Sequence, residues 1–393
     1  MSNFGIVCEF NPFHNGHKRI INEARTLGAD NVVCAMSGNA VQRGELAIAD
    51  KYTRAKAAVL CGADLVLELP YPFSAASAEY FARCGVRILS DFCDNIIFGS
   101  ECGDISVLTE AAEIVCSDDF KKEYRARLDS GEGAASAYFS ILGEHGFGEL
   151  SSNDLLGIEY IKAANELGLD IQFYTVKRNG DAYRESRLGE NENTSASAIR
   201  AAWRGGNLNT EAYMPPEAYE VFLEAARNGE LSSYDEISKA VLMFFRASNG
   251  EDFRGIASTD GGIANRICSA AREATGIDEL YEKIRTKRYT DAKLRRAVLF
   301  CLTGVSEEML NGTVGYTTLL AANSRGRALL SLARRGNTLR IVTKSASAPR
   351  DSAQFAAEER LSDIFTLSQK KPLDAGVAFR KNAFILNKNE VEQ

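Results

Sequence analysis

The sequence predicts an α/β fold, with a parallel sheet covered by helices in residues 1–205 and a mostly α-helical part in residues 206–393. Through the first half, short apolar runs alternate with helical patterns, which is typical of right-handed crossovers between parallel strands. Gly-Gly and Pro-Pro pairs between residues 205 and 216 then separate this half from a region of helical periodicity. We therefore expect two domains that meet near residue 205.

The predicted elements follow the chain in order. Five apolar runs are expected to be strands, at residues 4–10, 31–36, 64–70, 95–100 and 171–178. Helical patterns cover residues 16–28, 50–63, 77–89, 104–142 and 151–168, and helical periodicity dominates residues 217–335, before a candidate strand at 335–346. Ligands of such sheets bind outside the carboxyl ends of the strands.

The composition is that of an ordinary globular chain, with 45% hydrophobic and 25% charged residues. Nine cysteines are scattered without CxxC spacing, so we predict neither a metal site nor a disulfide framework. The N-terminus lacks a basic, apolar leader, and no apolar run reaches the roughly 18 residues of a membrane span. We expect a cytoplasmic protein without a membrane partner.

The charge is unevenly distributed. The whole chain has a net charge of −7, whereas residues 283–350 contain fourteen Lys and Arg and only three acidic residues. Such asymmetry indicates a polyanionic partner for the C-terminal part. The alternative is a set of solvated helix faces paired with acidic groups elsewhere in the fold.

Residues 5–17, GIVCEFNPFHNGH, contain two of the three histidines. His14 and His17 are predicted to lie beside a helix N-terminus, which favours an anion, and Gly16 lets the backbone approach a ligand. Two imidazoles there can donate hydrogen bonds to a phosphate in a transition state, as nucleotidyl transfer requires. A metal site with these two histidines would lack further ligands, because no other His or Cys cluster completes it. In a purely structural interpretation, one histidine caps the helix and the other lies in the core.

The segment NPFHNGH resembles the (H/T)xGH signature of the nucleotidyltransferase superfamily, which includes class I aminoacyl-tRNA synthetases. That superfamily has a second phosphate element, and TSASAIR at residues 194–200 is similar to it. Ser195 and Ser197 would then cap a helix and bind phosphate oxygens, while Arg200 would neutralise the triphosphate. The alternative is an ordinary helix cap followed by a solvated arginine.

Longer blocks occur in one order with this motif, at residues 37–70, 152–163 and 287–296. Together they resemble the tRNA(Met) cytidine acetate ligase family. The resemblance implies a Rossmann-like, HUP-type nucleotidyltransferase domain in residues 1–205 and a basic tRNA-binding domain in residues 206–393. It also implies a reaction in which ATP and acetate form acetyl-adenylate and pyrophosphate. The acetyl group then passes to N4 of the wobble cytidine of elongator tRNA(Met), giving N4-acetylcytidine.

The resemblance further implies which residues bind ATP. They are the segment Val7, Cys8, Glu9, Phe10, Asn11, Pro12, Phe13, His14, Asn15, Gly16, His17, Lys18, Arg19 and Ile20, with Gly99, Asn153 and Arg178. We predict His14, His17 and Lys18 as the catalytic residues. Lys18 could equally be a solvated helix residue, Asn153 a helix cap in place of a reader of the adenine edge, and Arg178 a surface residue.

Two further groups of candidates come from the same region. Arg43 is a candidate for binding acetate or phosphate and Lys51 for an unspecified function, while Asp50 is a natural helix cap. Magnesium is expected to arrive with ATP, and it needs few protein ligands when it is held by phosphates. Glu9 and Glu101 are the candidate carboxylates.

The basic stretch at residues 285–296 is predicted to be a helical run that contacts tRNA phosphates, with binding that weakens as salt rises. Its basic residues are Arg285, Lys287, Arg288, Lys293, Arg295 and Arg296. A second basic helix is expected at residues 324–336. Two other functions stay open, a small-molecule adenylyltransferase and a non-catalytic RNA-binding protein that keeps an ATP-binding fold. Dependence on acetate would distinguish a ligase from the adenylyltransferase. Any turnover of ATP would distinguish a ligase from the non-catalytic RNA-binding protein.

Overall fold

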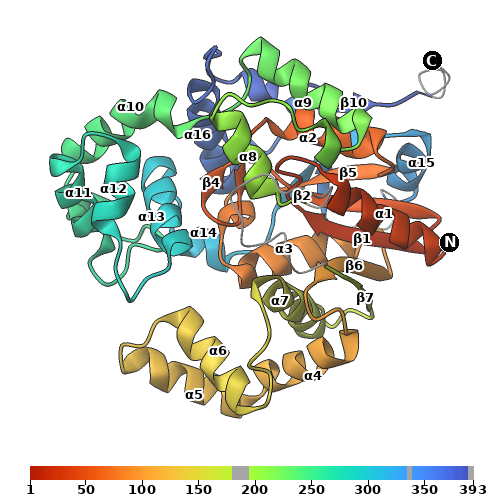
Figure 1. Ribbon diagram of the computed structural model, residues 1–393, viewed down its shortest axis with the longest axis horizontal. Helices are drawn as coiled ribbons and strands as arrows, with labels where there is room; N and C mark the ends of the chain where they lie inside the picture. Colours follow the sequence, from red (N-terminus) through yellow and green to blue (C-terminus); the bar gives the residue numbers. More distant parts are fainter. Residues whose placement is uncertain (179–193, 334–338, 388–393) are drawn as a thin grey trace.

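The computed structural model describes residues 1–178, 194–333 and 339–387, and its centre is one large sheet (Figure 1). The strand order is β10-β8-β5-β2-β1-β6-β7, with β9 paired to β8. The strands are β1 (Asn3–Cys8), β2 (Asn31–Ser37), β5 (Leu65–Leu69), β6 (Asn95–Ser100), β7 (Gln172–Lys177), β8 (Tyr316–Ala322), β9 (Arg340–Val342) and β10 (Phe384–Ile385). The first five are parallel, as predicted, and β8 runs antiparallel to β5.

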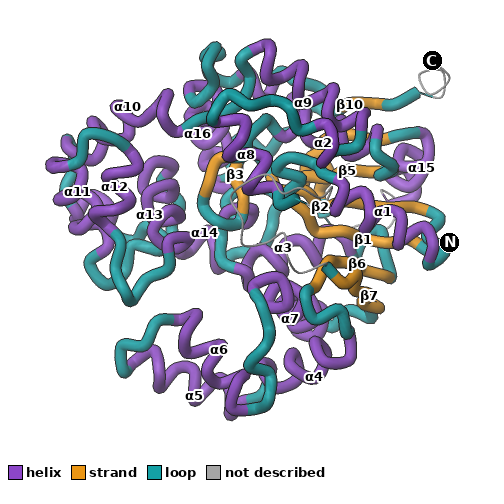
Figure 2. Tube along the Cα trace, in the orientation of Figure 1, coloured by secondary structure: helices purple, strands orange, loops and turns teal. Residues whose placement is uncertain are grey.

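Helices cover both faces of the sheet, which appears in Figure 2 as orange strands between purple helices. One face is covered by α1 (Asn15–Thr26), α2 (Lys51–Leu60), α8 (Ala196–Arg204) and α9 (Pro216–Asn228). The other is covered by α3 (Ala78–Leu89), α4 (Ile105–Cys116), α7 (Ser152–Leu167) and α15 (Ser324–Ala333).

Strand β1 shows why its sequence is a continuous apolar run. Phe4, Ile6 and Cys8 pack with α1 and α2, whereas Val7 packs with α3 on the opposite face. Gly5 also points to α3, where an added Cβ would lie 2.8 Å from Leu89. A strand buried on both faces needs apolar or small residues at every position, so alternation of polar and apolar residues is absent.

A second, helical body lies beside the sheet (Figure 1). Its core is formed by α10 (Tyr234–Arg246), α11 (Ile263–Glu273), α12 (Ile277–Ile284), α13 (Asp291–Thr303) and α16 (Ala353–Leu367). The hydroxyl of Tyr71, just after β5, lies 2.6 Å from that of Thr303 at the end of α13, and joins this core to the sheet. The short α14 (Glu307–Asn311) leads back to β8.

The acidic stretch predicted as helical at residues 104–142 forms α4 and the hairpin of α5 (Asp118–Asp129) and α6 (Ala134–Glu144). This hairpin projects from the lower edge of the molecule in Figure 1. None of the helices in the described ranges combines the length and the apolarity that a bilayer crossing requires.

Two expectations about the C-terminal half are wrong. Residues 316–322 form β8, a buried strand that was not expected within 217–335, where helical periodicity dominates. Tyr316, Thr317 and Thr318 favour a strand, and the following Leu-Leu-Ala-Ala run suits a position buried on both faces. Residues 285–290 form a loop between α12 and α13, so the stretch 285–296 is not one helix.

The later strands also bear on the division of the chain. β8, β9 and β10 return to the sheet, so the purely helical part ends at α14. Of the predicted strand at 335–346, only Arg340–Val342 is a strand, and residues 334–338 lie outside the described part. The functional boundary near residue 205 stays a prediction.

Candidate active site

Two histidines cap the N-terminus of α1 reciprocally. Nδ1 of His14 accepts the backbone N–H of Gly16 at 3.0 Å, and Nδ1 of His17 accepts the backbone N–H of His14 at 3.2 Å. The ring centroids are 3.9 Å apart. An added Cβ on Gly16 would lie 2.7 Å from Cε1 of His14, so the His14 ring itself requires the glycine. Both rings are therefore held by the helix end.

Burial keeps both imidazoles neutral. It lowers the pKa of His14 to about 3, with a smaller effect from the charges of Arg178 and Arg200. The pKa of His17 is also lowered well below its ordinary value, first by burial and then by His14. A neutral ring whose Nδ1 accepts a hydrogen bond carries its proton on Nε2. Each ring thus has an Nε2–H donor suited to an anionic oxygen.

The second phosphate element lies against the first. Ser195 caps α8, as predicted, and accepts the N–H of Ala198 at 3.1 Å. Arg200, one turn later, donates from Nη1 to the carbonyl of Asn11 at 2.7 Å and from Nη2 to the hydroxyl of the exposed Ser197 at 3.2 Å. One guanidinium therefore joins two motifs that are 189 residues apart in the chain.

The remaining predicted ATP residues meet at the carboxyl ends of β6 and β7. Gly99 lies in β6, and an added Cβ there would lie 3.4 Å from the side chain of Arg178, which follows β7. Glu101 lies 3.5 Å from the Arg178 guanidinium and accepts the amide N–H of Asn153 at 2.6 Å. Asn153 is not a helix cap, because Ser151 caps α7.

The candidate magnesium carboxylates are already engaged. The oxygens of Glu101 accept from Asn153 and from the hydroxyl of Ser151, and Oε1 of Glu9 accepts the N–H of Gln42 at 2.9 Å. Burial raises the pKa of Glu9. Within the described ranges, no group of three His, Cys, Asp or Glu side chains is placed to hold a metal ion.

Two aromatic residues of the segment 7–20 pack behind the histidines. Phe10 and Phe13 are buried and pack edge to face at 4.8 Å, and Phe10 also lies 4.9 Å from the His17 ring. Phe10 has a φ of 45°, a left-handed conformation that is uncommon for such a residue and clusters at functional sites. The chain turns sharply here between β1 and the histidine motif.

Lys18 has a different environment from the one expected. Its ammonium donates to the carbonyl of Cys61, beyond the C-terminus of α2, at 2.8 Å. Cations near a helix C-terminus interact favourably with the free carbonyls there, so this contact is structural. The catalytic role predicted for Lys18 gains no support from it and stays a prediction.

Arg54 is a positioning residue that the sequence did not single out. Its guanidinium is completely buried and donates to four backbone carbonyls, those of Ala49 at 3.0 Å, Glu9 at 2.6 Å, Ser37 at 2.9 Å and Gly38. Burial lowers its pKa to about 10, so it remains cationic at neutral pH. It therefore ties the ends of β1 and β2 to α2.

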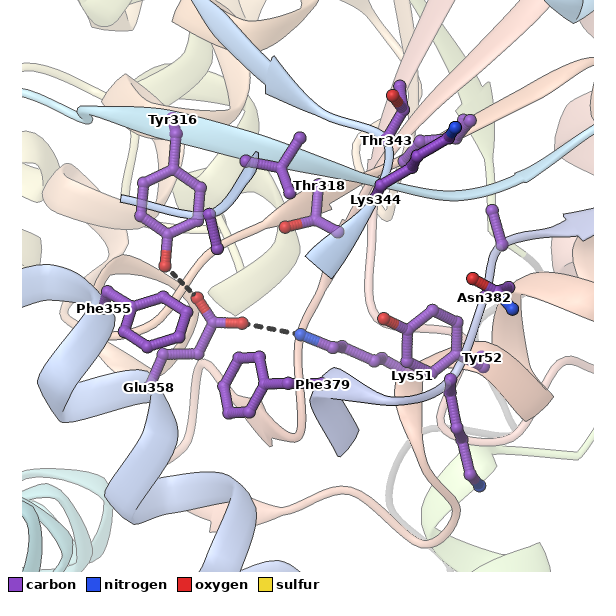
Figure 3. Close-up of a pocket in the computed structure, with 15 residues that line it drawn as sticks. Lys51, Tyr52, Tyr316, Thr318, Thr343, Lys344, Phe355, Glu358, Phe379 and Asn382 are labelled. Atoms are coloured by element: carbon purple, nitrogen blue, oxygen red, sulfur yellow. Dashed lines mark hydrogen bonds and ion pairs between the residues drawn. The ribbon is translucent and has the colours of Figure 1, made fainter. Parts of the chain in front are cut away.

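Lys51 belongs to a buried ion-pair network (Figure 3). Its ammonium lies 2.7 Å from both carboxylate oxygens of Glu68 and 2.6 Å from Glu358, which accepts the hydroxyl of Tyr316 at 2.5 Å. The cavity beside it measures about 20 Å³, room for about one water, and none of its lining residues comes from the histidine motif. The network therefore supports a structural role, in which it joins α2 and α16 to strands β5 and β8 of the sheet.

The six basic residues predicted to contact tRNA are divided between a loop and a helix. Lys287 and Arg288 are exposed in the loop before α13, and Arg285 in that loop pairs with Asp291 at 2.8 Å. The other three, Lys293, Arg295 and Arg296, lie on α13. Of the second basic stretch, α15 covers Ser324–Ala333, and Arg334 and Arg335 lie outside the described residues.

Comparison with known proteins agrees with this geometry. A family model described as HIGH Nucleotidyl Transferase matches residues 1–377. A tRNA(Met) cytidine acetate ligase of Acetivibrio thermocellus is 34% identical, over 98% of this chain and 100% of the relative. The chain belongs to the tRNA(Met) cytidine acetate ligase family. Another member, from Clostridium perfringens, is 33% identical over 88% of this chain and 91% of its own.

Solved structures show the same relationship. The chain matches Thermotoga maritima TmcAL bound with alpha-thio ATP with a TM-score of 0.88 and 30% identity, over 99% of this chain and 100% of the other. The apo structure of the same protein matches with a TM-score of 0.89. The family resemblance and the nucleotidyltransferase fold expected from the sequence are therefore confirmed, and the chain is an enzyme of this ligase family.

Proposed function

We propose that this protein is an ATP-dependent acetate ligase that forms N4-acetylcytidine at the wobble cytidine of elongator tRNA(Met). One observation carries the proposal. Two neutral imidazoles are held by the N-terminus of α1, where the charge of Arg178 acts on both of them and that of Arg200 acts on His14. Membership of the ligase family and the likeness to a relative bound with alpha-thio ATP support ATP as the nucleotide.

In the first step, an acetate oxygen attacks the α-phosphate of ATP, and pyrophosphate leaves with the electrons of the broken bond. The Nε2–H groups of His14 and His17 donate to the phosphate oxygens as charge builds on them. The N-terminus of α1 and the Arg200 guanidinium attract the triphosphate. The enzyme acts here by position and charge, and no residue has to form a covalent intermediate.

In the second step, the N4 amine of the cytidine attacks the acetyl carbonyl of acetyl-adenylate. AMP leaves, and the amine loses one proton. The base must be unstacked and shielded, because water competes for the same carbonyl. The exposed Lys287 and Arg288 suit tRNA phosphates, which attract Lys and Arg irrespective of sequence.

Magnesium would enter as the complex with ATP, held mainly by the phosphates. The described residues fit that arrangement, because Glu101 is occupied by hydrogen bonds and Glu9 offers at most one further carboxylate oxygen. Asn153 and Arg178 would line the nucleoside side of the site, beside Gly99.

The test is acetylation of tRNA by the purified protein with ATP, Mg²⁺ and labelled acetate. A tRNA(Met) with its wobble cytidine replaced serves as the control. Label in the unmodified tRNA alone is the expected result. Turnover of ATP that depends on neither acetate nor tRNA would point to a small-molecule adenylyltransferase. Binding of tRNA without any ATP turnover would point to a non-catalytic RNA-binding protein.

A further inference from the structure

A small hairpin connects the histidine motif to the helical body. It consists of β3 (Ala40–Val41) and β4 (Glu45–Leu46), with Gln42, Arg43 and Gly44 in the turn. We call residues 40–46 the 40s hairpin. Its two strands form a small sheet of their own, apart from the main sheet. In the chain it follows the carboxyl end of β2 and precedes α2.

On one side, the 40s hairpin and the residues after it hold the segment that leads into the histidine motif. The N–H of Gln42 donates to the carboxylate of Glu9 at 2.9 Å, and the N–H of Ile48 donates to the side chain of Asn11 at 2.7 Å. Arg43, exposed at the turn, acts electrostatically on Glu9. The turn therefore presents a cation beside the nucleotide site.

On the other side, the hairpin is clamped by α13. Arg295 forms an ion pair with Glu45, and Arg296 donates to the carbonyl of Gln42 at 3.3 Å. Gly44 has a φ of 74°, and an added Cβ would lie 2.6 Å from the backbone nitrogen of Arg296. The turn and α13 are thus packed backbone to backbone, and only glycine fits between them.

The ion pair is held by further contacts. The Arg295 guanidinium lies over the Tyr281 ring at 5.8 Å, and the neighbouring Tyr234 donates to the carbonyl of Gly44 at 3.5 Å. The Glu45 side chain is 15% exposed and that of Arg295 is 34% exposed. An arginine oriented in this way towards a half-buried carboxylate is poorly placed to serve as a tRNA ligand.

We propose that Arg295 is a positioning residue for acetate activation. Through Glu45 it fixes the 40s hairpin, and the hairpin fixes Glu9 and Asn11 at the entrance to the histidine motif and presents Arg43 to the nucleotide site. This inference rests on the proposed function, because it concerns the adenylation step. It replaces the expectation that Arg295 contacts tRNA phosphates.

The test uses acetate-dependent exchange of labelled pyrophosphate into ATP, measured on the full chain without tRNA. Arg295→Glu and Glu45→Arg are each expected to lower the exchange rate about tenfold or more, because small displacements of positioning groups are costly. The double variant, which restores the pair with its charges exchanged, is expected to recover to within about threefold of the unaltered protein. Arg254→Glu is the matched control, because it reverses a charge on an 84% exposed arginine and breaks only a surface ion pair with Glu251.

The outcomes separate this inference from the proposed function. No acetate-dependent exchange by the unaltered protein would count against the ligase. Normal exchange by Arg295→Glu, with weaker tRNA binding, would overturn the positioning role and restore the tRNA contact. If Arg295→Glu fails to fold, Glu45→Gln breaks the same pair with a smaller change, and an unchanged kcat and KM for ATP in that variant would also overturn the proposal.

Discussion

Nδ1 of His17 accepts the backbone N–H of His14 at 3.2 Å, so the second histidine of the motif holds the first in place. His14 in turn accepts from Gly16, which completes a capping box built from two imidazoles. Serine or threonine with glutamate is the usual pair in this arrangement. The imidazoles differ because, after capping, each still has a donor on Nε2.

The two roles of the histidines can be separated by substitution. Asn at position 14 and Gln at position 17 keep the capping capacity but lose the Nε2–H donor. We expect His14→Asn and His17→Gln each to lower kcat for tRNA acetylation by about two to three orders of magnitude, as removal of one charge-stabilising donor does. The melting temperature should fall by less than about 4 °C. Nearly full activity in either variant would mean that its ring only caps the helix.

The stability of the protein should fall as the pH drops from about 6.5 towards 4. His14 has a pKa of about 3 in the folded protein, so across this window the unfolded chain binds a proton that the folded chain does not. Such a group adds a slope of about 1.4 kcal/mol per pH unit to the free energy of unfolding, which rises with pH. When the free energy of unfolding is measured with urea at several pH values, its slope against pH should be shallower by this amount in His14→Asn. Parallel curves for the two proteins would contradict the neutral, buried state of His14.

Removal of the buried ammonium of Lys51 should be costly. Lys51→Met leaves Glu68 and Glu358 facing each other without their cation, and we expect a loss of about 3–5 kcal/mol in the free energy of unfolding. Lys56→Met in the same helix is the control, because its ammonium lies 3.9 Å from an exposed Glu224, and it should change stability by less than about 0.5 kcal/mol. Equal effects of the two substitutions in urea unfolding would show that the network does not stabilise the fold.

The loop before α13 should carry part of the tRNA affinity. We expect Lys287→Ala and Arg288→Ala each to reduce by about one the slope of log affinity against log salt concentration. Filter binding across a range of salt concentrations measures this slope, and Arg254→Ala is the control for general surface charge. An unchanged slope in both loop variants would move the tRNA site away from residues 285–290.

Much of the N-terminal part could be predicted from the sequence. Each of the five strands expected there is present. Strands β1, β2 and β5 are buried on both faces and therefore have continuous apolar runs that are visible without the structure. The helix starts at His14 and Ser195 were also predictable, since local capping patterns apply there, and their role in binding phosphate stays a prediction.

Other features were not predictable because they depend on distant partners. β8 follows a long helical region, and its place beside β5 is set by the sheet, not by local periodicity. The basic residues of 285–296 look alike in the sequence, yet Arg295 faces Glu45, 250 residues away, while Lys287 faces solvent. Arg54 is an ordinary helix residue until four carbonyls converge on it.

The sequence by itself determined the alternation of strands and helices and the two capped helix starts, at His14 and Ser195, since both follow from local periodicity and capping. The tertiary structure alone decided which charged side chains gather at the histidine motif and which pair with one another. The histidine pair and Arg178 meet because parallel strands bring their carboxyl ends to one edge, and Arg200 reaches the same place from α8 by its hydrogen bond to Asn11. Lys51 is buried and Arg295 is turned towards the protein because carboxylates from remote segments pair with their charges.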